Sequence, residues 1–225
     1  MPIERTPEGF WVVVGDTLRT IWVKERKKLD VDHLIPAICE FIKKGDTIID
    51  VGANIGDHTI AYIRAVGAGG RVIAFEPDPE CFACCVLNCG TFADMYNAAA
   101  LDKRARVGLQ TIANRGENFV RLDAADGEIV GFPIDDLRLD RVDLVKIDVE
   151  GAEMMVLRGA SETILALHPL IICELVEAQL NRFRTTIDEV KSWLGLMGYV
   201  GRPLMSGETR DWLFWPDGKE PVIVG

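Results

Sequence analysis

Short apolar runs rich in β-branched residues alternate along most of this chain with segments whose apolar residues recur every three or four positions. The runs predict strands at Thr47–Val51, Arg71–Phe75, Met95–Ala100, Leu144–Ile147 and Leu170–Glu174. The helical spacing predicts helices at Asp57–Val66, after Pro79, at Ala152–Leu167 and at Ile187–Leu196. This alternation is typical of a parallel sheet covered by helices on both faces.

The N-terminal part follows a different pattern. Phe10–Val14 and Leu18–Val23 flank Gly15-Asp16 and predict a β-hairpin. Val31–Lys44 has helical spacing, with Asp30 as its N-cap and Gly45 at its end. We therefore expect residues 1–44 to form a cap or edge extension, not an independent domain, and residues 45–225 to form the α/β domain.

Two further hairpins are expected in the rest of the chain. The segment Arg106–Phe132 is less regular and has room for an extra hairpin. Tyr199–Pro203 and Arg210–Trp215 predict a final pair of strands at the C-terminal end.

Composition and charge narrow the function classes. The 225 residues carry a formal net charge of −10, which disfavours a nucleic acid as partner because the phosphate backbone would be repelled. No apolar run approaches the length of about 18 residues that spans a bilayer. The first residues lack the apolar core of a leader peptide, so we expect a cytoplasmic protein.

Four of the six cysteines cluster after the second predicted strand, at Cys81, Cys84, Cys85 and Cys89. Cys-x-x-Cys can indicate a metal site. However, offsets of three, four and eight positions place these thiols on one face of a helix, where free cysteine behaves as a small buried hydrophobe. We expect core packing for them, as for Cys39 and Cys173.

Glycines follow the first predicted strand of the α/β domain in the order Asp50-Val-Gly-Ala-Asn-Ile-Gly. About 20 residues further on, the next strand ends at Glu76. Glycines at such a turn let the backbone approach a nucleoside cofactor, and an acid after the second strand can accept hydrogen bonds from both ribose hydroxyls. A turn that binds nothing is the alternative interpretation of the glycines alone.

The identity of the cofactor follows from how this loop departs from the dinucleotide pattern GxGxxG. Asn54 and Asp57 stand at two of the three glycine positions. Asp50 and Asp57 would also bring negative charge near a pyrophosphate. S-adenosylmethionine carries a cationic amine and a sulfonium and has no phosphate, so it suits this loop better than a dinucleotide does.

Four phrases stand in a fixed order: Asp50-Val-Gly-Ala-Asn-Ile-Gly-Asp-His-Thr, Phe75-Glu-Pro-Asp-Pro, Asn97-Ala-Ala-Ala-Leu-Asp-Lys and Lys146-Ile-Asp-Val-Glu-Gly-Ala-Glu. From Asp46 to the C-terminus the chain resembles the FkbM family of S-adenosylmethionine-dependent methyltransferases. The last phrase, followed by Leu157-Arg-Gly-Ala, is the most specific. The resemblance implies a class I methyltransferase fold, with a seven-stranded sheet ending in an antiparallel hairpin. It also implies O-methylation of sugars, lipid-linked glycans or natural products.

The same resemblance suggests the cofactor-binding residues. They are Asp50, Gly52, Asn54, Gly56, His58, Glu76, Pro77, Asp78, Ala99, Asn114 and Asp148. Within this set, Ala99 is expected beside the adenine and Asn114 belongs to a loop near the cofactor. His58 could orient the acceptor or act as a base, or it could simply pack under the loop. His33 and His168 are expected to be structural.

Acids at the ends of two predicted strands are the candidate catalytic residues. Asp148 and Glu150 follow one strand and Glu174 ends the next, so all three are expected at the carboxyl edge of the sheet. An alcohol acceptor must lose a proton, and a carboxylate there could accept it. A divalent cation shared by the three acids is an open alternative, and we assign no metal ligand from the sequence. The other interpretation is that Glu150 or Glu153 caps the next helix.

Other functions remain open at this stage. The chain could be a catalytically silent S-adenosylmethionine-binding subunit, or an N-methyltransferase acting on a substrate other than nucleic acid. A nucleotide-dependent oxidoreductase is disfavoured by the loop. The expected partner is a small-molecule or glycan hydroxyl, and exposed faces of Trp11, Trp22 and Trp212 could mediate a homodimer.

Overall fold

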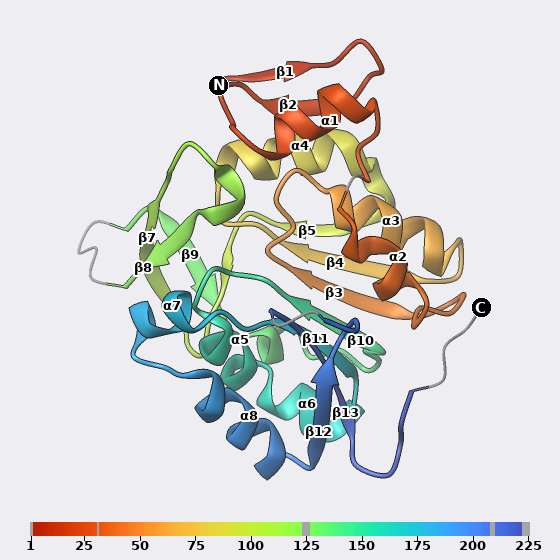
Figure 1. Cartoon of the computed structure of the whole chain (residues 1–225), viewed down its shortest axis with the longest axis vertical. Coiled ribbons are helices and arrows are strands. Elements are labelled where there is room, and N and C mark those ends of the chain that lie inside the picture. The colour runs from red at the N-terminus through yellow and green to blue at the C-terminus, as the bar shows by residue number, and fades with distance from the viewer. Residues whose placement is uncertain (1, 31, 123–126, 208–209, 222–225) are drawn as a thin grey trace.

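The computed structural model describes residues 2–30, 32–122, 127–207 and 210–221, and a seven-stranded sheet runs through its centre (Figure 1). In spatial order its strands are β12 (Tyr199–Pro203), β13 (Asp211–Pro216), β11 (Leu170–Glu174), β10 (Leu144–Ile147), β3 (Thr47–Val51), β4 (Arg71–Phe75) and β5 (Asp94–Tyr96). The pairings from β11 to β5 are parallel, whereas β13 is antiparallel to β11 and to β12. The predicted fold class, including the C-terminal hairpin, is confirmed.

Helices cover both faces of this sheet. One face carries α5 (Glu153–Gly159), α6 (Ser161–Leu167) and α8 (Ile187–Leu196); the other carries α2 (Leu34–Cys39), α3 (Asp57–Val66) and α4 (Pro79–Cys89). Side chains alternate along each strand, so Ile49 and Val51 face the first group while Ile48 faces α2 and α3. Because both faces are covered, the central strands read as continuous apolar runs.

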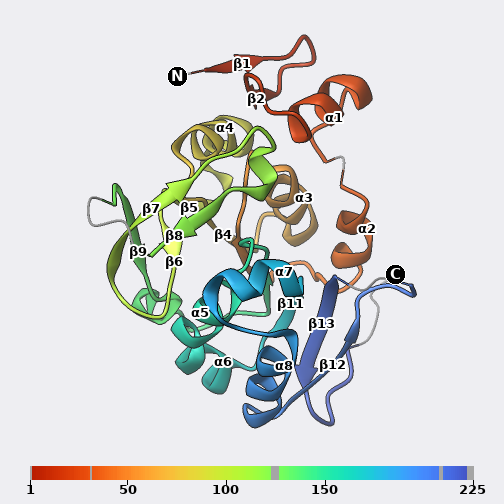
Figure 2. The same ribbon diagram turned by 60° about the vertical axis from the view of Figure 1, so that its left-hand side comes forward.

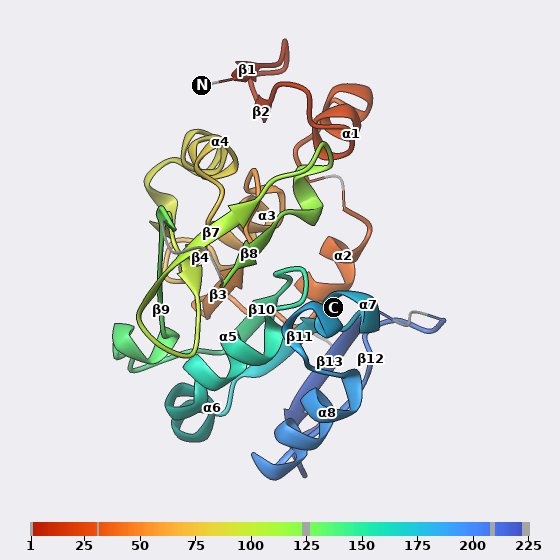
Figure 3. The same ribbon diagram turned by 90° about the vertical axis from the view of Figure 1, so that its left-hand side faces the viewer.

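A second, four-stranded sheet lies near the carboxyl ends of the central strands. Its order is β6 (Ala99–Ala100), β9 (Ile129–Phe132), β7 (Ala105–Gln110) and β8 (Phe119–Arg121). Figure 3 shows β7 and β8 in front of β3 and β4. The antiparallel β7–β8 pair confirms the extra hairpin. The single strand predicted at Met95–Ala100 is wrong, because β5 pairs with β4 and β6 pairs with β9 in the other sheet.

The predicted N-terminal hairpin is also wrong. β2 (Trp11–Val13) pairs with β1 (Ile3–Arg5), and the expected second strand, Leu18–Val23, is part of the helix α1 (Arg19–Arg26). The Asp16 carboxylate accepts a hydrogen bond from the Thr20 N–H, which satisfies a donor in the first turn. Figure 2 shows these N-terminal elements at one end of the molecule, beyond α3 and α4.

Two predicted helices are shorter than expected. Of Val31–Lys44, only α2 is helical; Val31 itself lies outside the described residues. Its start is fixed by Asp32, whose carboxylate accepts from the Leu34 N–H, not by Asp30. Its end comes before Gly45, because the Lys43 N–H donates to the Asp46 carboxylate in a turn.

The helix predicted at Ala152–Leu167 is interrupted between α5 and α6. At Gly159 the helix backbone passes so close to the chain that an added Cβ would lie 1.9 Å from the carbonyl oxygen of Leu101. Only glycine permits this approach. The break therefore follows from packing against the segment after β6.

The clustered cysteines lie in the core, as predicted. Cys81, Cys84, Cys85 and Cys89 are buried along α4, Cys173 is buried in β11, and Cys39 is half-buried. All six are free thiols. In the part of the chain that the structure describes, no helix combines the length and apolar character that crossing a membrane requires.

Candidate active site

A cavity opens where β3, β4 and β10 end. Its lining comes from three strand ends, from Ala98–Ala100 and from the segment before β8. The lining residues are Val51, Gly52, Asn54, Phe75, Glu76, Pro77, Ala98, Ala99, Ala100, Arg115, Gly116, Asn118, Val120, Asp148, Val149, Glu150 and Ala152. The lining combines apolar residues with three acids, Glu76, Asp148 and Glu150.

The glycine loop after β3 brings two strand ends into contact. Gly52 has φ +89°, and a Cβ there would lie 1.8 Å from the carbonyl oxygen of Asp148. The N–H groups of Gly52 and Ala53 both donate to the Phe75 carbonyl. Asn54 also has a positive φ of 50°, which is uncommon outside glycine and typical of residues held for function. This geometry keeps the loop open toward the cavity.

Glu76 lies in the cavity wall between two backbone donors. Its carboxylate accepts from the N–H groups of Asn54 and Asp78, each at 2.7 Å. Burial raises the pKa of Glu76 to about 8, and these two amides act in the opposite direction. Each oxygen keeps an acceptor site for a hydroxyl, because a carboxylate offers about four lone-pair sites.

The segment before β8 covers the cavity and is fastened to α4. Arg115 forms ion pairs with Asp78 at 3.1 Å and Glu80 at 2.8 Å, and Asn118 donates to Asp78 at 2.7 Å. Asp78, the N-cap of α4, thus holds the segment before β8 against this helix. Sequence reasoning missed Arg115, Gly116 and Asn118 as cavity residues; the only signal was the neighbouring Asn114.

A second cavity adjoins the first and shares Gly116, Asp148 and Glu150 with it. The rest of its lining comes from the N-terminal segment, the loop before β8 and the ends of β11 and β13. Those residues are Leu18, Arg19, Trp22, Asp32, His33, Leu34, Asn114, Glu117, Glu174, Arg210 and Asp211. This wall is strongly acidic and includes one tryptophan.

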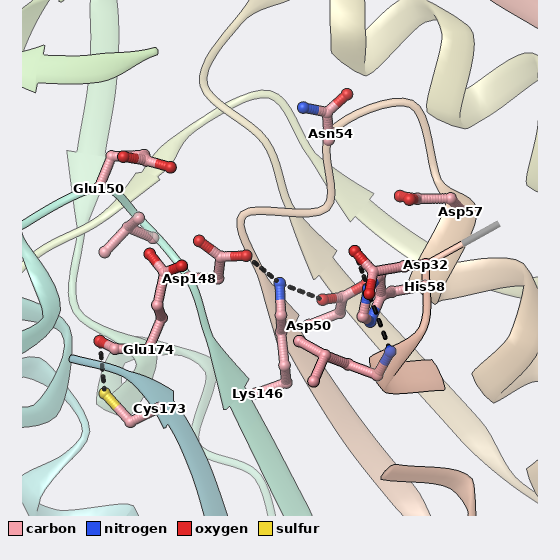
Figure 4. A network of polar contacts seen from close by, with 12 residues as sticks. Asp32, Asp50, Asn54, Asp57, His58, Lys146, Asp148, Glu150, Cys173 and Glu174 are labelled. Atoms are coloured by element: carbon pink, nitrogen blue, oxygen red, sulfur yellow. Dashed lines mark hydrogen bonds and ion pairs between the residues drawn. The ribbon is translucent and has the colours of Figure 1, made fainter. Parts of the chain in front are cut away.

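Asp148, Glu150 and Glu174 form what we call the strand-end cluster. Each offers a carboxylate oxygen within 4.8 Å of the other two. Figure 4 shows the three side chains converging from the ends of β10 and β11. Burial, reinforced by repulsion from Asp148, raises the pKa of Glu150 to about 8 and that of Glu174 to about 9.

Lys146 and Arg210 each form an ion pair with one carboxylate of this cluster. Lys146 lies 3.2 Å from Asp148 and 4.0 Å from Asp50. Although burial favours the neutral carboxyl, Lys146 and Arg19 hold the pKa of Asp148 below its usual range. Arg210 pairs with Oε1 of Glu174.

The loop that carries Glu150 is held by Glu153 and Gln179. Oε1 of Glu153 accepts from the N–H groups of Val149 and Gly151, and Gln179 donates to the Glu150 carboxylate. Glu150 has φ +60°, a strained conformation for a residue with a side chain. Glu150 therefore does not cap α5, as one sequence interpretation had it; it points into the cavities.

A second acidic group, the Arg19 cluster, consists of Arg19, Asp32, Asp57 and His58. Arg19 lies 2.6 Å from Asp32 and 3.1 Å from Asp57, and Nε2 of His58 lies 3.6 Å from Asp32. Burial opposes the charge on Asp32, but His58 and Arg19 hold its pKa far below the usual range. Through Arg19, this cluster ties α1 to Asp57 at the start of α3. Figure 4 shows Asp32 beside His58.

The structure brings together about half of the predicted cofactor residues. Gly52, Asn54, Glu76, Pro77, Ala99 and Asp148 line the first cavity. Asp50, Gly56, His58, Asp78 and Asn114 are not among its lining residues. Asp50 is fully buried and accepts from Thr59, Gly56 packs against Cys85 and Cys89, and His58 contacts Tyr62 at 2.9 Å. Their direct contact with a cofactor stays a prediction.

Known proteins similar in sequence to this chain are methyltransferases. Residues 50–200 match the family model described as methyltransferase FkbM domain. The 2-O-methyltransferase NoeI of Sinorhizobium fredii is 24% identical over 183 residues, covering 70% of this chain and 75% of that protein. Methyltransferase sdnD of Sordaria araneosa is 27% identical over 159 residues, covering 51% of this chain and 60% of its own length.

Solved structures share the fold. Methyltransferase FkbM from Methylobacillus flagellatus superposes with a TM-score of 0.53 at 19% identity, over 76% of this chain but only 43% of its own. A SAM-dependent methyltransferase from Aquifex aeolicus has a TM-score of 0.52 at 15% identity, over 91% of this chain and 98% of its own. Since the family model covers residues 50–200, with the strand-end acids and the glycine loop inside it, the chain belongs to the FkbM family of methyltransferases.

Proposed function

We propose that the protein transfers the methyl group of S-adenosylmethionine to a hydroxyl of a sugar, a glycan or a small natural product. The observation that carries this proposal is the shared wall of the two cavities, where Asp148 and Glu150 lie. One cavity suits a nucleoside, the other an acceptor, and the methyl group passes between them at the acids.

The lining of the first cavity suggests an orientation for the cofactor. Glu76 accepts hydrogen bonds from the ribose hydroxyls, and the apolar wall at Ala98–Ala100 receives the adenine. The methionine end then lies toward Gly52 and Asp148, where the carboxylate attracts the amine and the sulfonium.

The chemistry is an in-line displacement. The acceptor oxygen forms a bond to the methyl carbon while the carbon–sulfur bond breaks. The electron pair of the broken bond stays on sulfur, which gives S-adenosylhomocysteine. Asp148 or Glu150 accepts the hydroxyl proton. Holding the two reactants in line is the larger contribution, worth up to about 7–11 kcal/mol.

The charge of the second cavity limits the acceptor. Six acidic side chains line it, against two arginines. A phosphorylated or carboxylated acceptor would be repelled, whereas hydroxyls can donate to these carboxylates. Trp22 contributes an aromatic side chain to this wall, and its ring is contacted by Arg19 and Arg26. We therefore expect a neutral or cationic polyol.

Calorimetric titration with S-adenosylmethionine and, separately, NAD tests the cofactor. S-adenosylmethionine should bind and NAD should not. Glu76→Ala should weaken the affinity by about 10–100-fold, because hydrogen bonds to a charged group contribute about 1.5–3 kcal/mol. Glu128→Ala removes an exposed acid and should leave the affinity unchanged. Binding of NAD, or no effect of Glu76→Ala, would contradict the proposal.

A further inference from the structure

The strand-end cluster has more negative charge than its neighbours neutralise. Its three carboxylates come from two adjacent strand ends. Lys146 pairs with Asp148 but also lies near Asp50, and Arg210, which pairs with Glu174, is 56% exposed. Arg19 and Arg182 act electrostatically on Asp148 and Glu150, respectively. Like charges this close repel one another strongly when buried.

One carboxylate oxygen of the cluster has no partner. The Glu174 side chain is 9% exposed, and its Oε2 atom is buried without a hydrogen-bond donor among the described residues. Arg210 contacts the other oxygen, Oε1. A buried oxygen left unsatisfied costs about 1–3 kcal/mol, more if it is charged, so this atom indicates a missing positive ligand. Figure 4 shows the Glu174 carboxylate directed at Asp148.

We propose that the strand-end cluster binds one divalent cation through Asp148, Glu150 and Glu174. Oxygens on opposite sides of Mg²⁺ or Ca²⁺ are about 4–5 Å apart, since the ligand distances are about 2.0–2.6 Å. The three oxygens lie within 4.8 Å of one another, so none of the pairs is too far apart to share one ion. A donor set made only of carboxylates selects Mg²⁺, Mn²⁺ or Ca²⁺ over softer metals.

The Arg19 cluster shows why the same proposal does not apply there. Asp32, Asp57 and His58 also bring ligand atoms within 4.8 Å, but the guanidinium of Arg19 already lies between the two carboxylates. The Arg19 guanidinium therefore occupies the position in which a metal ion would bind.

The position of the ion suggests a role in catalysis, and this role rests on the proposed function. Asp148 and Glu150 line both cavities, so an ion held by them lies beside the acceptor. It would coordinate the acceptor hydroxyl and lower the pKa of that hydroxyl. A vicinal diol, which offers two oxygens, would bind best.

Mn²⁺ binding tests the inference without any turnover. The chelator-treated protein is titrated with Mn²⁺, and free Mn²⁺ is followed by electron paramagnetic resonance. We expect one site, and Glu174→Gln should weaken it by at least about tenfold, the loss that even outer-shell changes cause in metal sites. Asp188→Asn, which neutralises an exposed acid, should bind Mn²⁺ as the unmodified protein does.

A parallel titration with S-adenosylmethionine separates this inference from the proposed function. Glu174 does not line the first cavity, so Glu174→Gln should retain cofactor affinity and an unchanged circular dichroism spectrum. Mn²⁺ affinity equal in Glu174→Gln and the unmodified protein, or no specific Mn²⁺ site, would overturn the metal site. If the unmodified protein does not bind S-adenosylmethionine, the proposed function would be overturned instead.

Discussion

The strand-end cluster and the Arg19 cluster are both acidic and mostly buried, yet they are neutralised in different ways. In the Arg19 cluster, the Arg19 side chain from α1 lies between Asp32 and Asp57 and helps to lower the pKa of Asp32. In the strand-end cluster, Lys146 pairs with Oδ2 of Asp148 and Arg210 pairs with Oε1 of Glu174. Burial and mutual repulsion then raise the pKa values of Glu150 and Glu174.

The difference separates structural from chemical use of buried charge. A cluster with its own cation is a fixed joint, because removing any member leaves a buried charge unpaired. A cluster whose cations pair with only some of its carboxylate oxygens can change its protonation and accept ligands. We expect the first to control stability and the second to control binding, and three measurements can break or sharpen that distinction.

The largest effect is expected from Arg19→Met, which retains an apolar stem and removes the cation. Two buried carboxylates would lose their partner, and the free energy of unfolding should fall by about 3–5 kcal/mol in urea titration. Arg64→Met removes an exposed partner of Asp30 and should cost about 0–1 kcal/mol. If both variants lose the same free energy of unfolding, the Arg19 cluster does not stabilise the fold more than an exposed ion pair does.

A smaller effect is expected from pH, with opposite signs for the two clusters. The pKa of Glu174, about 9 when folded, exceeds its ordinary value of 4.5. Between these values the folded state binds more protons than the unfolded state, so stability falls as pH rises. The lowered pKa of Asp32 works the other way, and its contribution is lost only as pH falls below about 4.

Unfolding titrations of Glu174→Gln across this range isolate the first of these effects. Relative to the unmodified protein, the variant should gain about 1–3 kcal/mol between pH 5 and pH 9. Saturating Mn²⁺ should remove most of that difference at high pH, because the ion binds only the folded state. A difference independent of pH would show that Glu174 stays ionised.

The smallest effect is expected from Tyr62→Phe. The Tyr62 hydroxyl contacts Nδ1 of the buried His58 at 2.9 Å. Its removal should lower the free energy of unfolding by about 1 kcal/mol. Because His58 does not line the first cavity, affinity for S-adenosylmethionine should not change. A weakened affinity would instead support His58 as a cofactor residue.

The central fold was predictable because its signals are local. Thr47–Val51 and Leu170–Glu174 are apolar runs bounded by turn residues, and each forms the expected strand. The N-terminal error had a physical cause. Leu18–Val23 has β-type residues, but the Asp16 side chain starts a helix there, and β2 pairs with the polar segment Ile3–Arg5.

The candidate site was predictable only where chemistry lies at strand ends. Glu76, Asp148 and Glu174 follow from their positions after predicted strands. The Arg19 cluster joins residues far apart in the sequence, and no periodicity relates Arg19 to Asp57. Arg115 was missed for the same reason, since its partner Asp78 lies 37 positions away.

The two cavities also differ in where their walls come from along the chain. Every residue that lines the first cavity lies within residues 50–200, the segment that matches the family model. The second cavity takes Leu18, Arg19 and Trp22 from before that segment and Arg210 and Asp211 from after it. Under the proposed function, a chimaera that exchanges these flanks should change the acceptor preference while the cavity for the methyl donor stays constant.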